Sequence, residues 1–232
     1  MHAQMSGEPG YLIFSGGVDW EGRQGIDQEL LLASGGNEVA VLPTAAAYQG
    51  PAGMVAAAAK RWAALGAGIR EIPVLTRRDA EDENNASLLA QARLIHIGDG
   101  SSLHLRSVLQ DSKVFAAIVD AWHHGAVVMG EGAGAMVLCD PMIDIRGGAL
   151  TLGLGVVRGM AVLTGFGRES AEKVHRSIVL AAPMHCVVGV EDTAMLIRQP
   201  AGSWRVEGEG HVLVFRHGQQ VGMDVLEAIE TA

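Results

Sequence analysis

Residues 127–136 read Val-Val-Met-Gly-Glu-Gly-Ala-Gly-Ala-Met, and this stretch decides the fold. An apolar run of strand type enters a turn that contains Gly130, Gly132 and Gly134, and small residues that begin a helix follow it. Small residues let the backbone turn sharply without Cβ clashes. The pattern is typical of a nucleophile elbow, a strand-to-helix turn that exposes one hydroxyl or thiol above a sheet. The middle position, however, is Gly132, which has no side chain and cannot attack a substrate.

Around this turn, short apolar runs alternate with helical patterns. Strands are expected at 11–14, 39–42, 69–75 and 94–97, and an Ala-rich helix at 53–65. Such alternation predicts a three-layer α/β sandwich with a mainly parallel central sheet flanked by helices. After residue 145, shorter apolar runs predict a meander of strands near the sheet edge, at 187–190, 194–197, 204–206 and 211–215. We expect a flexible N-terminus at 1–10 and a single domain over 11–232.

Composition excludes several classes of function. The 232 residues carry 17 basic and 26 acidic side chains, a net charge of −9, and such a surface argues against binding to nucleic acid. The two cysteines, Cys139 and Cys186, form no CxxC pair and are expected to be buried, and the nine histidines lack the spacing of metal ligands. No cofactor and no metal are therefore expected. Because no signal peptide or long apolar run stands out, we expect a cytoplasmic protein without a membrane segment.

Several segments of the chain occur together in an informative order. They are Val-Leu-Pro-Thr-Ala at 41–45, Gly-Asp-Gly-Ser-Ser-Leu-His-Leu at 98–105, the turn at 130–135, Gly-Leu-Gly at 153–155, Gly-Val-Glu-Asp-Thr-Ala at 189–194 and Gly-Glu-Gly-His-Val at 208–212. In this order they resemble the peptidase E and cyanophycinase family of serine peptidases, over nearly the whole chain. The resemblance implies a fold similar to that of class I glutamine amidotransferases. It also implies a homodimer, which nothing in the sequence itself shows.

In that family a histidine activates a serine nucleophile, and an acidic residue orients the histidine. Carried over by the resemblance, the serine position falls on Gly132 within an otherwise matching elbow. The histidine position falls on Gly165, and the acidic position falls on Glu191, which is present. Two of the three catalytic positions are glycine, which indicates loss of the activity rather than one isolated change. With no histidine to orient, Glu191 is expected to have a raised pKa if it is buried.

The rest of the family's cleft is partly present. The backbone N–H groups of Gly100 and Ala133 are expected to form an oxyanion hole, since donors of this kind need no side chain. Asp99 replaces a glycine of the family's turn, and its carboxylate would oppose negative charge developing beside it.

Further cleft residues are expected around this turn. Ser101 and Ser102 are candidate replacement nucleophiles, although a serine at a helix start is more often an N-cap. Glu131 is expected either to bind a cation in the pocket or to point to solvent. Arg176, or else Arg168, is matched loosely to the family's basic positions that bind an acidic substrate.

The leading hypothesis from the sequence is a catalytically impaired peptidase E-like protein that binds a small peptide or amino-acid-like ligand. One alternative is an active peptidase or amide hydrolase that uses a non-standard nucleophile or a water activated by Glu191. In that case Ser102 and His104 are the next residues to consider. A second alternative is a structural or regulatory partner protein in which the cleft has no role.

Overall fold

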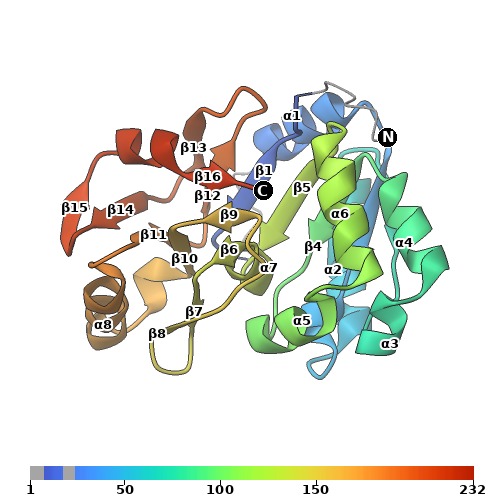
Figure 1. The fold of residues 1–232 in the computed structure, drawn as a ribbon. Coiled ribbons are helices and arrows are strands. Elements are labelled where there is room, and N and C mark those ends of the chain that lie inside the picture. Colours follow the sequence, from blue (N-terminus) through green and yellow to red (C-terminus); the bar gives the residue numbers. More distant parts are fainter. Residues whose placement is uncertain (1–7, 18–23) are drawn as a thin grey trace, which may run out of the picture.

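The computed structural model describes residues 8–17 and 24–232, so most of the N-terminus expected to be flexible lies outside the described residues. The first half of the chain alternates strands and helices (Figure 1). In chain order these are β1 Leu12–Ser15, α1 Gln24–Ser34, β2 Glu38–Leu42, the 3-10 helix η1 Thr44–Ala46, α2 Pro51–Ala63, β3 Gly68–Glu71, α3 Arg77–Ala80, α4 Glu83–Ala90, β4 Leu94–Ile97, α5 Ser102–Leu109, α6 Lys113–His123, β5 Val127–Glu131 and α7 Ala133–Val137.

The second half is richer in short strands. Its elements are β6 Cys139–Asp140, β7 Met142–Asp144, β8 Ala149–Thr151, β9 Val157–Arg158, β10 Met160–Thr164, the 3-10 helix η2 Phe166–Arg168, α8 Ala171–Ala181, β11 Cys186–Val190, β12 Ala194–Arg198, β13 Trp204–Gly208, β14 Val212–Arg216, β15 Gln219–Val221, the 3-10 helix η3 Met223–Ala228 and β16 Glu230–Thr231. The helix expected near the C-terminus is therefore a 3-10 helix.

The main sheet has seven strands in the order β13-β12-β1-β5-β4-β2-β3. The five neighbouring strands β1, β5, β4, β2 and β3 are parallel to one another. On the other side of β1, β12 pairs antiparallel with β1, and β13 pairs antiparallel with β12. Side chains alternate between its two faces, as the period of two in a strand requires. On β1, Ile13 packs with α1 and α2, whereas Leu12 and Phe14 belong to the cluster that contains residues of α4 to α7. The three-layer α/β fold with a mainly parallel sheet is thus confirmed.

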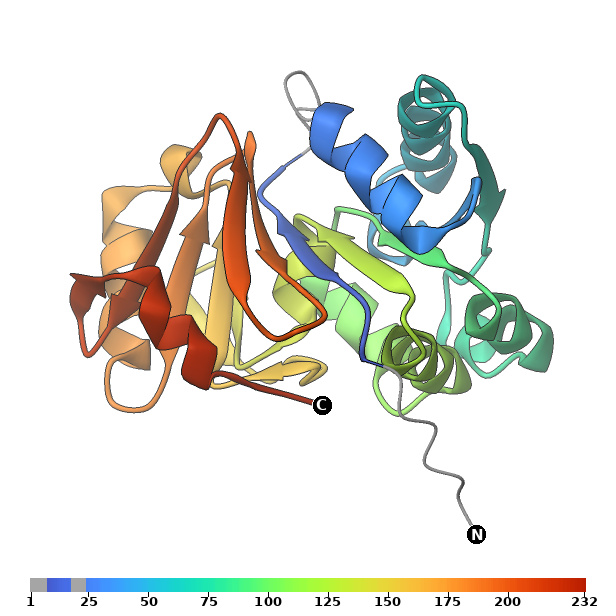
Figure 2. The same ribbon diagram turned by 90° about the horizontal axis from the view of Figure 1, so that it is seen from above.

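A second sheet, of order β10-β11-β14-β15, lies beside the main sheet (Figures 1 and 2). Its strands β10 and β11 are parallel, with Thr164 opposite Val190. The expected meander is wrong in detail, because β12 and β13 join the main sheet while β11 and β14 pair in the second one. The two sheets share one apolar cluster, and the Gly165 N–H donates to the Gly16 carbonyl at 3.0 Å, which ties the end of β10 to the end of β1.

Strand register brings the cleft residues together. Ser15 at the end of β1 lies opposite Glu131 at the end of β5, and Ile97 at the end of β4 lies opposite Gly130. The loops after β1, β4 and β5 therefore leave the sheet at the same carboxyl edge, where ligands bind in open α/β sheets. Within the described ranges, no helix is long and apolar enough to cross a bilayer.

Candidate functional site

The turn after β5 has the geometry of a nucleophile elbow. Gly132 has φ 54° and ψ −113°, a backbone conformation that residues other than glycine rarely adopt. Its neighbours must be small as well. A Cβ on Gly130 would lie 2.6 Å from the backbone nitrogen of Ala135, and one on Gly134 would lie 2.3 Å from the carbonyl oxygen of Ile97. The glycine pattern of the sequence is therefore explained by backbone packing as well as by the turn.

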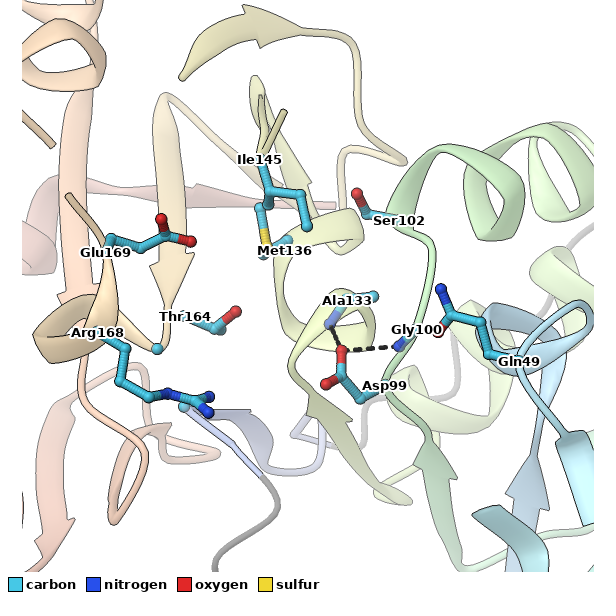
Figure 3. A pocket seen from close by; sticks show the side chains of 12 residues that line it. Gln49, Asp99, Gly100, Ser102, Ala133, Met136, Ile145, Thr164, Arg168 and Glu169 are labelled. Carbon is cyan, nitrogen blue, oxygen red and sulfur yellow. Dashed lines mark hydrogen bonds between the residues drawn. The ribbon is translucent and has the colours of Figure 1, made fainter. Parts of the chain in front are cut away.

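The two N–H groups expected to form an oxyanion hole point at one oxygen atom. That atom is Oδ1 of Asp99, which accepts from the backbone nitrogens of Gly100 and Ala133 at 2.7 Å each (Figure 3). The donors come from two elements, the loop after β4 and the start of α7. Each distance is that of a short charge-assisted hydrogen bond. A carboxylate of the protein itself therefore accepts from both donors of the oxyanion hole that the sequence predicts.

The same carboxylate also takes the space that a side chain at position 132 would need. A Cβ built on Gly132 would lie 2.1 Å from Asp99 Oδ1 and 2.2 Å from its carboxyl carbon. Real Cβ atoms do not approach other heavy atoms so closely. A side chain at position 132 and the observed position of the Asp99 side chain consequently exclude each other.

The environment of Asp99 raises the pKa of its carboxyl group. Partial burial is the largest cause, and the negative charge of Glu131 acts in the same direction. The N–H groups of Ala133 and Gly100 and the charge of Arg168 lower the pKa, but they do not outweigh burial. The group is thus a partly desolvated acid whose ionised form is held by two backbone donors.

Asp99 borders a cavity of about 310 Å³. The cavity is lined by Gly16, Gln49, Asp99, Gly100, Ser102, Ala133, Met136, Ile145, Thr164, Gly165, Arg168 and Glu169. A second hollow of about 510 Å³ shares Gln49, Asp99 and Gly100 with the first and is otherwise lined by Ala46, Gly50, Gly53, Met54, Ala57 and Glu131. Asp99 therefore stands at the border between a polar cavity and a more apolar one.

The two serines of the α5 start have different surroundings. The Ser101 hydroxyl accepts from the backbone nitrogen of His104 at 3.3 Å, so Ser101 is an N-cap rather than a nucleophile. Ser102 is 4% exposed and lines the cavity. His104 does not line the cavity, because its Nε2 lies 2.9 Å from the carbonyl oxygen of Leu75 and its ring packs against Tyr48.

The base and acid positions are not brought together as a functional pair. Gly165 lines the cavity with φ 64°, and a Cβ there would lie 3.3 Å from Arg168 Nη2 and 3.6 Å from Asp192 Oδ1. Arg168 and Asp192 form an ion pair, with 2.5 Å between Nε and Oδ2. Glu191 is not among the residues that line the cavity, and its Oε1 would lie 3.5 Å from a Cβ on Gly167.

Glu191 instead pairs with His211 on the surface. Its Oε2 accepts from the backbone nitrogen of His211 at 2.8 Å and lies 3.0 Å from Nδ1 of the same residue. These contacts lower the pKa of the Glu191 carboxyl group, and about a third of the side chain, 32%, is exposed. The raised pKa was expected only for a buried Glu191, and this condition is not met, because the side chain is partly exposed and accepts from His211.

Glu131 does not point to solvent. It is 2% exposed, and its Oε2 lies 3.1 Å from Arg61 Nη1 and 3.1 Å from His96 Nε2. Arg61 also forms a two-pronged ion pair with Asp27, at 2.7 Å and 2.5 Å. We call these four residues, Asp27, Arg61, His96 and Glu131, the buried ionic cluster. This cluster could not be predicted from the sequence, since no local pattern marks Arg61 as a buried residue within an Ala-rich helix.

Two further candidates lie away from the cavity. Arg176 is exposed on α8 and is not among the residues that line the cavity, whereas Arg168 does line it. Cys139 is fully buried, and burial strongly raises the pKa of its thiol, which leaves it unreactive. No group of three or more metal-ligating side chains occurs in the part of the chain that the structure describes.

The family is decided by comparison with known proteins. A model of peptidase family S51 matches residues 11–200, which is most of the chain. The chain belongs to this family. The resemblance to peptidase E and cyanophycinase found in the sequence is thereby confirmed.

Curated relatives of this S51 protein include the cyanophycinases of Synechococcus elongatus and Thermosynechococcus vestitus. Each is 26% identical over 160 residues, a match that covers 63% of this chain and 50% of the relative. The chain thus spans about half the length of the curated relatives that it matches.

Two solved structures share the fold. A peptidase from an acI-B1 Actinobacterium superposes with a TM-score of 0.82 at 21% identity, over 97% of this chain and 95% of the other. A putative peptidase E protein from Listeria monocytogenes EGD-e gives a TM-score of 0.67 at 14% identity, over 87% of this chain and 99% of the other. At these identities the likeness concerns the fold.

Proposed function

We propose that this S51 protein is catalytically inactive as a serine peptidase and binds a small peptide or amino-acid-like ligand in its remaining cleft. One observation carries the proposal. The Asp99 carboxylate accepts both hydrogen bonds of the oxyanion hole and fills the space next to Gly132 in which a nucleophile would stand.

Acyl transfer needs a nucleophile, a base and donors for the developing oxyanion. Position 132 has no nucleophile, and position 165 has no imidazole. The donors of Gly100 and Ala133 are occupied by Asp99, whose charge opposes a second negative charge in the same place. A cavity of about 310 Å³ remains beside these groups, and it offers Ser102, Thr164 and Arg168 as polar contacts for a ligand.

The alternative of a water activated by Glu191 has less support. Glu191 does not line the cavity, and the hydrogen bonds from His211 lower its pKa, which makes it a weaker base. No contact of the described residues favours the alternative of a purely structural partner protein. The cytoplasmic location and the homodimer stay predictions from the sequence and from the family resemblance.

Hydrolysis of a mixed dipeptide panel, rich in acidic N-terminal residues and followed by mass spectrometry, tests the loss of activity. We expect no turnover by the purified protein. Turnover that co-purifies with the protein and disappears in Gly132→Ala or Asp99→Asn would overturn the proposal. Retention of peptides from the same panel in native mass spectrometry tests ligand binding, and an empty spectrum would refute that half of it.

A further inference from the structure

The replacement of the family's glycine by Asp99 changes the charge of the site as well as its shape. An oxyanion hole is a cluster of donors that attracts negative charge. Here both donors are turned to Oδ1 of Asp99, so the group that faces the cavity is a carboxylate. The charge preference at the centre of the cleft is therefore reversed.

One oxygen of this carboxylate remains available. A carboxylate has about four acceptor sites on two oxygens, and the two backbone donors use only Oδ1. No residue in the described ranges 8–17 and 24–232 hydrogen-bonds Oδ2. Figure 3 shows this second oxygen on the side of the cavity where Thr164 and Arg168 lie. The two backbone bonds fix the carboxylate, so a ligand that binds Oδ2 does not need to order it.

The cations near Asp99 leave room for a cationic ligand. Arg168 lines the cavity, but its guanidinium is engaged by both carboxylate oxygens of Asp192, at 2.7 Å and 2.5 Å. On the other side, Glu131 adds negative charge, which contributes to the unfavourable environment of the Asp99 carboxylate. A positive group from a ligand would offset both burial and this repulsion.

Other lining groups indicate what surrounds such a cation. Ser102 is 4% exposed, lines the cavity and has no hydrogen-bond partner for its hydroxyl among the described residues. It is therefore a buried polar group directed at the cavity. The adjoining hollow of about 510 Å³ is walled mainly by apolar groups, of Ala46, Met54 and Ala57 among others. Together they fit a ligand with an ammonium group and a short apolar side chain.

We infer that the cleft binds a primary amine of this kind, such as a free peptide N-terminus or an amino-acid amide, through an ion pair between its ammonium group and Asp99 Oδ2. The hydroxyls of Ser102 and Thr164 complete the polar shell, and the apolar side chain enters the hollow beside Met54 and Ala57. This inference rests on the proposed function, because it names the ligand class of the same cleft.

The test uses leucinamide, a cation, and N-acetyl-leucinamide, which has the same side chain and no charge. Binding of each is measured by calorimetry and by the amide ¹H–¹⁵N signals of Gly100 and Ala133, at a pH of about 7, where most of the leucinamide still carries its ammonium charge. We expect leucinamide to bind at least about 10-fold more tightly than the acetylated compound, since a charge-assisted bond is lost on acetylation.

Asp99→Asn is the critical variant. The amide oxygen can still accept from Gly100 and Ala133, and its NH₂ group then faces the cavity and repels an ammonium group. We expect about 10-fold weaker leucinamide binding or more. The matched control, Asp120→Asn, removes a carboxylate on α6, outside the cavity, and should leave binding unchanged.

The outcomes separate this inference from the proposed function. Equal binding of leucinamide and N-acetyl-leucinamide, or unchanged leucinamide binding by Asp99→Asn, overturns the inference and leaves a ligand-binding cleft. If neither compound binds and the peptide panel is not retained either, both the inference and the ligand-binding proposal fail. Tighter binding of N-acetyl-leucine, an anion, than of leucinamide shows that the hole still selects negative charge and also overturns the inference.

Discussion

At the ends of β4 and β5, backbone N–H groups form the wall of the cleft. At the ends of β10 and β11, the predicted site positions contribute no side chain to it. In the first region Gly100 and Ala133 still direct their N–H groups at one point, which Asp99 now occupies. In the second region Gly165 has no side chain, and Glu191 pairs with His211 on the surface. Sheet register and turn conformation thus fix the geometry of the first region, whereas no side-chain pair borders the cavity in the second.

The largest expected effect comes from the buried ionic cluster beneath the first region. Arg61→Met removes the cation shared by Asp27 and Glu131 and leaves these carboxylates without it in a buried environment. We expect a loss of about 3–5 kcal/mol in the free energy of unfolding, measured by urea denaturation. Arg168→Met breaks the exposed pair with Asp192 in the second region and should cost about 0–1 kcal/mol. Equal losses in the two variants would contradict the contrast between the regions.

A second prediction concerns the exclusion between Asp99 and a side chain at position 132. Gly132→Ala should destabilise the protein by about 1–3 kcal/mol, because its Cβ meets the Asp99 carboxylate and its φ is positive. In the Asp99→Gly background the steric part disappears, so a double-mutant cycle should give a coupling of about 1 kcal/mol or more. Gly165→Ala is the matched change in the second region, and its cost should not depend on residue 99. A cycle without coupling at 132 would show that Asp99 moves aside freely.

The titration of the two carboxyl groups offers a third comparison. Burial raises the pKa of Asp99, so the folded state binds its proton more tightly than the unfolded state does. The contribution of this group to stability is therefore present at low pH and is lost as pH rises through the raised pKa. The pKa of Glu191 is lowered, so its contribution is present above the unfolded value of about 4.3 and is lost as pH falls.

Carboxyl ¹³C titration by NMR measures both midpoints. We expect the Asp99 midpoint above about 3.9 and the Glu191 midpoint below about 4.3. In addition, Asp99→Asn should become more stable relative to the unmodified protein as pH rises from about 4 to about 7, because it removes the group whose ionisation opposes folding. Midpoints that shift in the same direction would contradict the assignment of the two environments.

The smallest effect is expected for Glu191 itself. Its pair with His211 is exposed, and Glu191→Gln should change the free energy of unfolding by less than about 1 kcal/mol. Leucinamide binding should stay the same, since Glu191 does not line the cavity. A clear loss of binding in Glu191→Gln would mean that the second region still takes part in the site.

The sequence predicted those parts of the fold that depend on local patterns. The glycines at 130, 132 and 134, and the alternation of apolar runs with helices, led to the elbow and to the parallel sheet. The assignment of later strands failed because β11 and β12 are both short apolar runs, and the choice between the two sheets is made by tertiary packing. The local sequence of a strand does not determine which of the two sheets it joins.

The candidate site was also predicted only in those parts that a local motif marks. The N–H groups of Gly100 and Ala133 were named from the motif, and Asp99 was recognised as a charge in the wrong place. The position of the Asp99 side chain in the oxyanion hole could not be inferred from the sequence. It is possible only because residue 132 has no Cβ, which would lie 2.1 Å from Asp99 Oδ1. Arg61 was missed because a single arginine in an Ala-rich helix normally lies in solvent. Its burial is explained by long-range contacts, which include those to Asp27 and Glu131.

The close approach of Asp99 to position 132 also has a consequence for protein engineering. A serine introduced at 132 alone meets the Asp99 carboxylate, and a glycine introduced at 99 alone supplies no nucleophile. Neither substitution by itself supplies a serine that is free to react, and position 165 would still carry no imidazole. A serine–histidine pair therefore has to be introduced together with a change at 99. In this way one carboxylate held by two backbone donors ties the choice of residue at 132 to the choice of residue at 99.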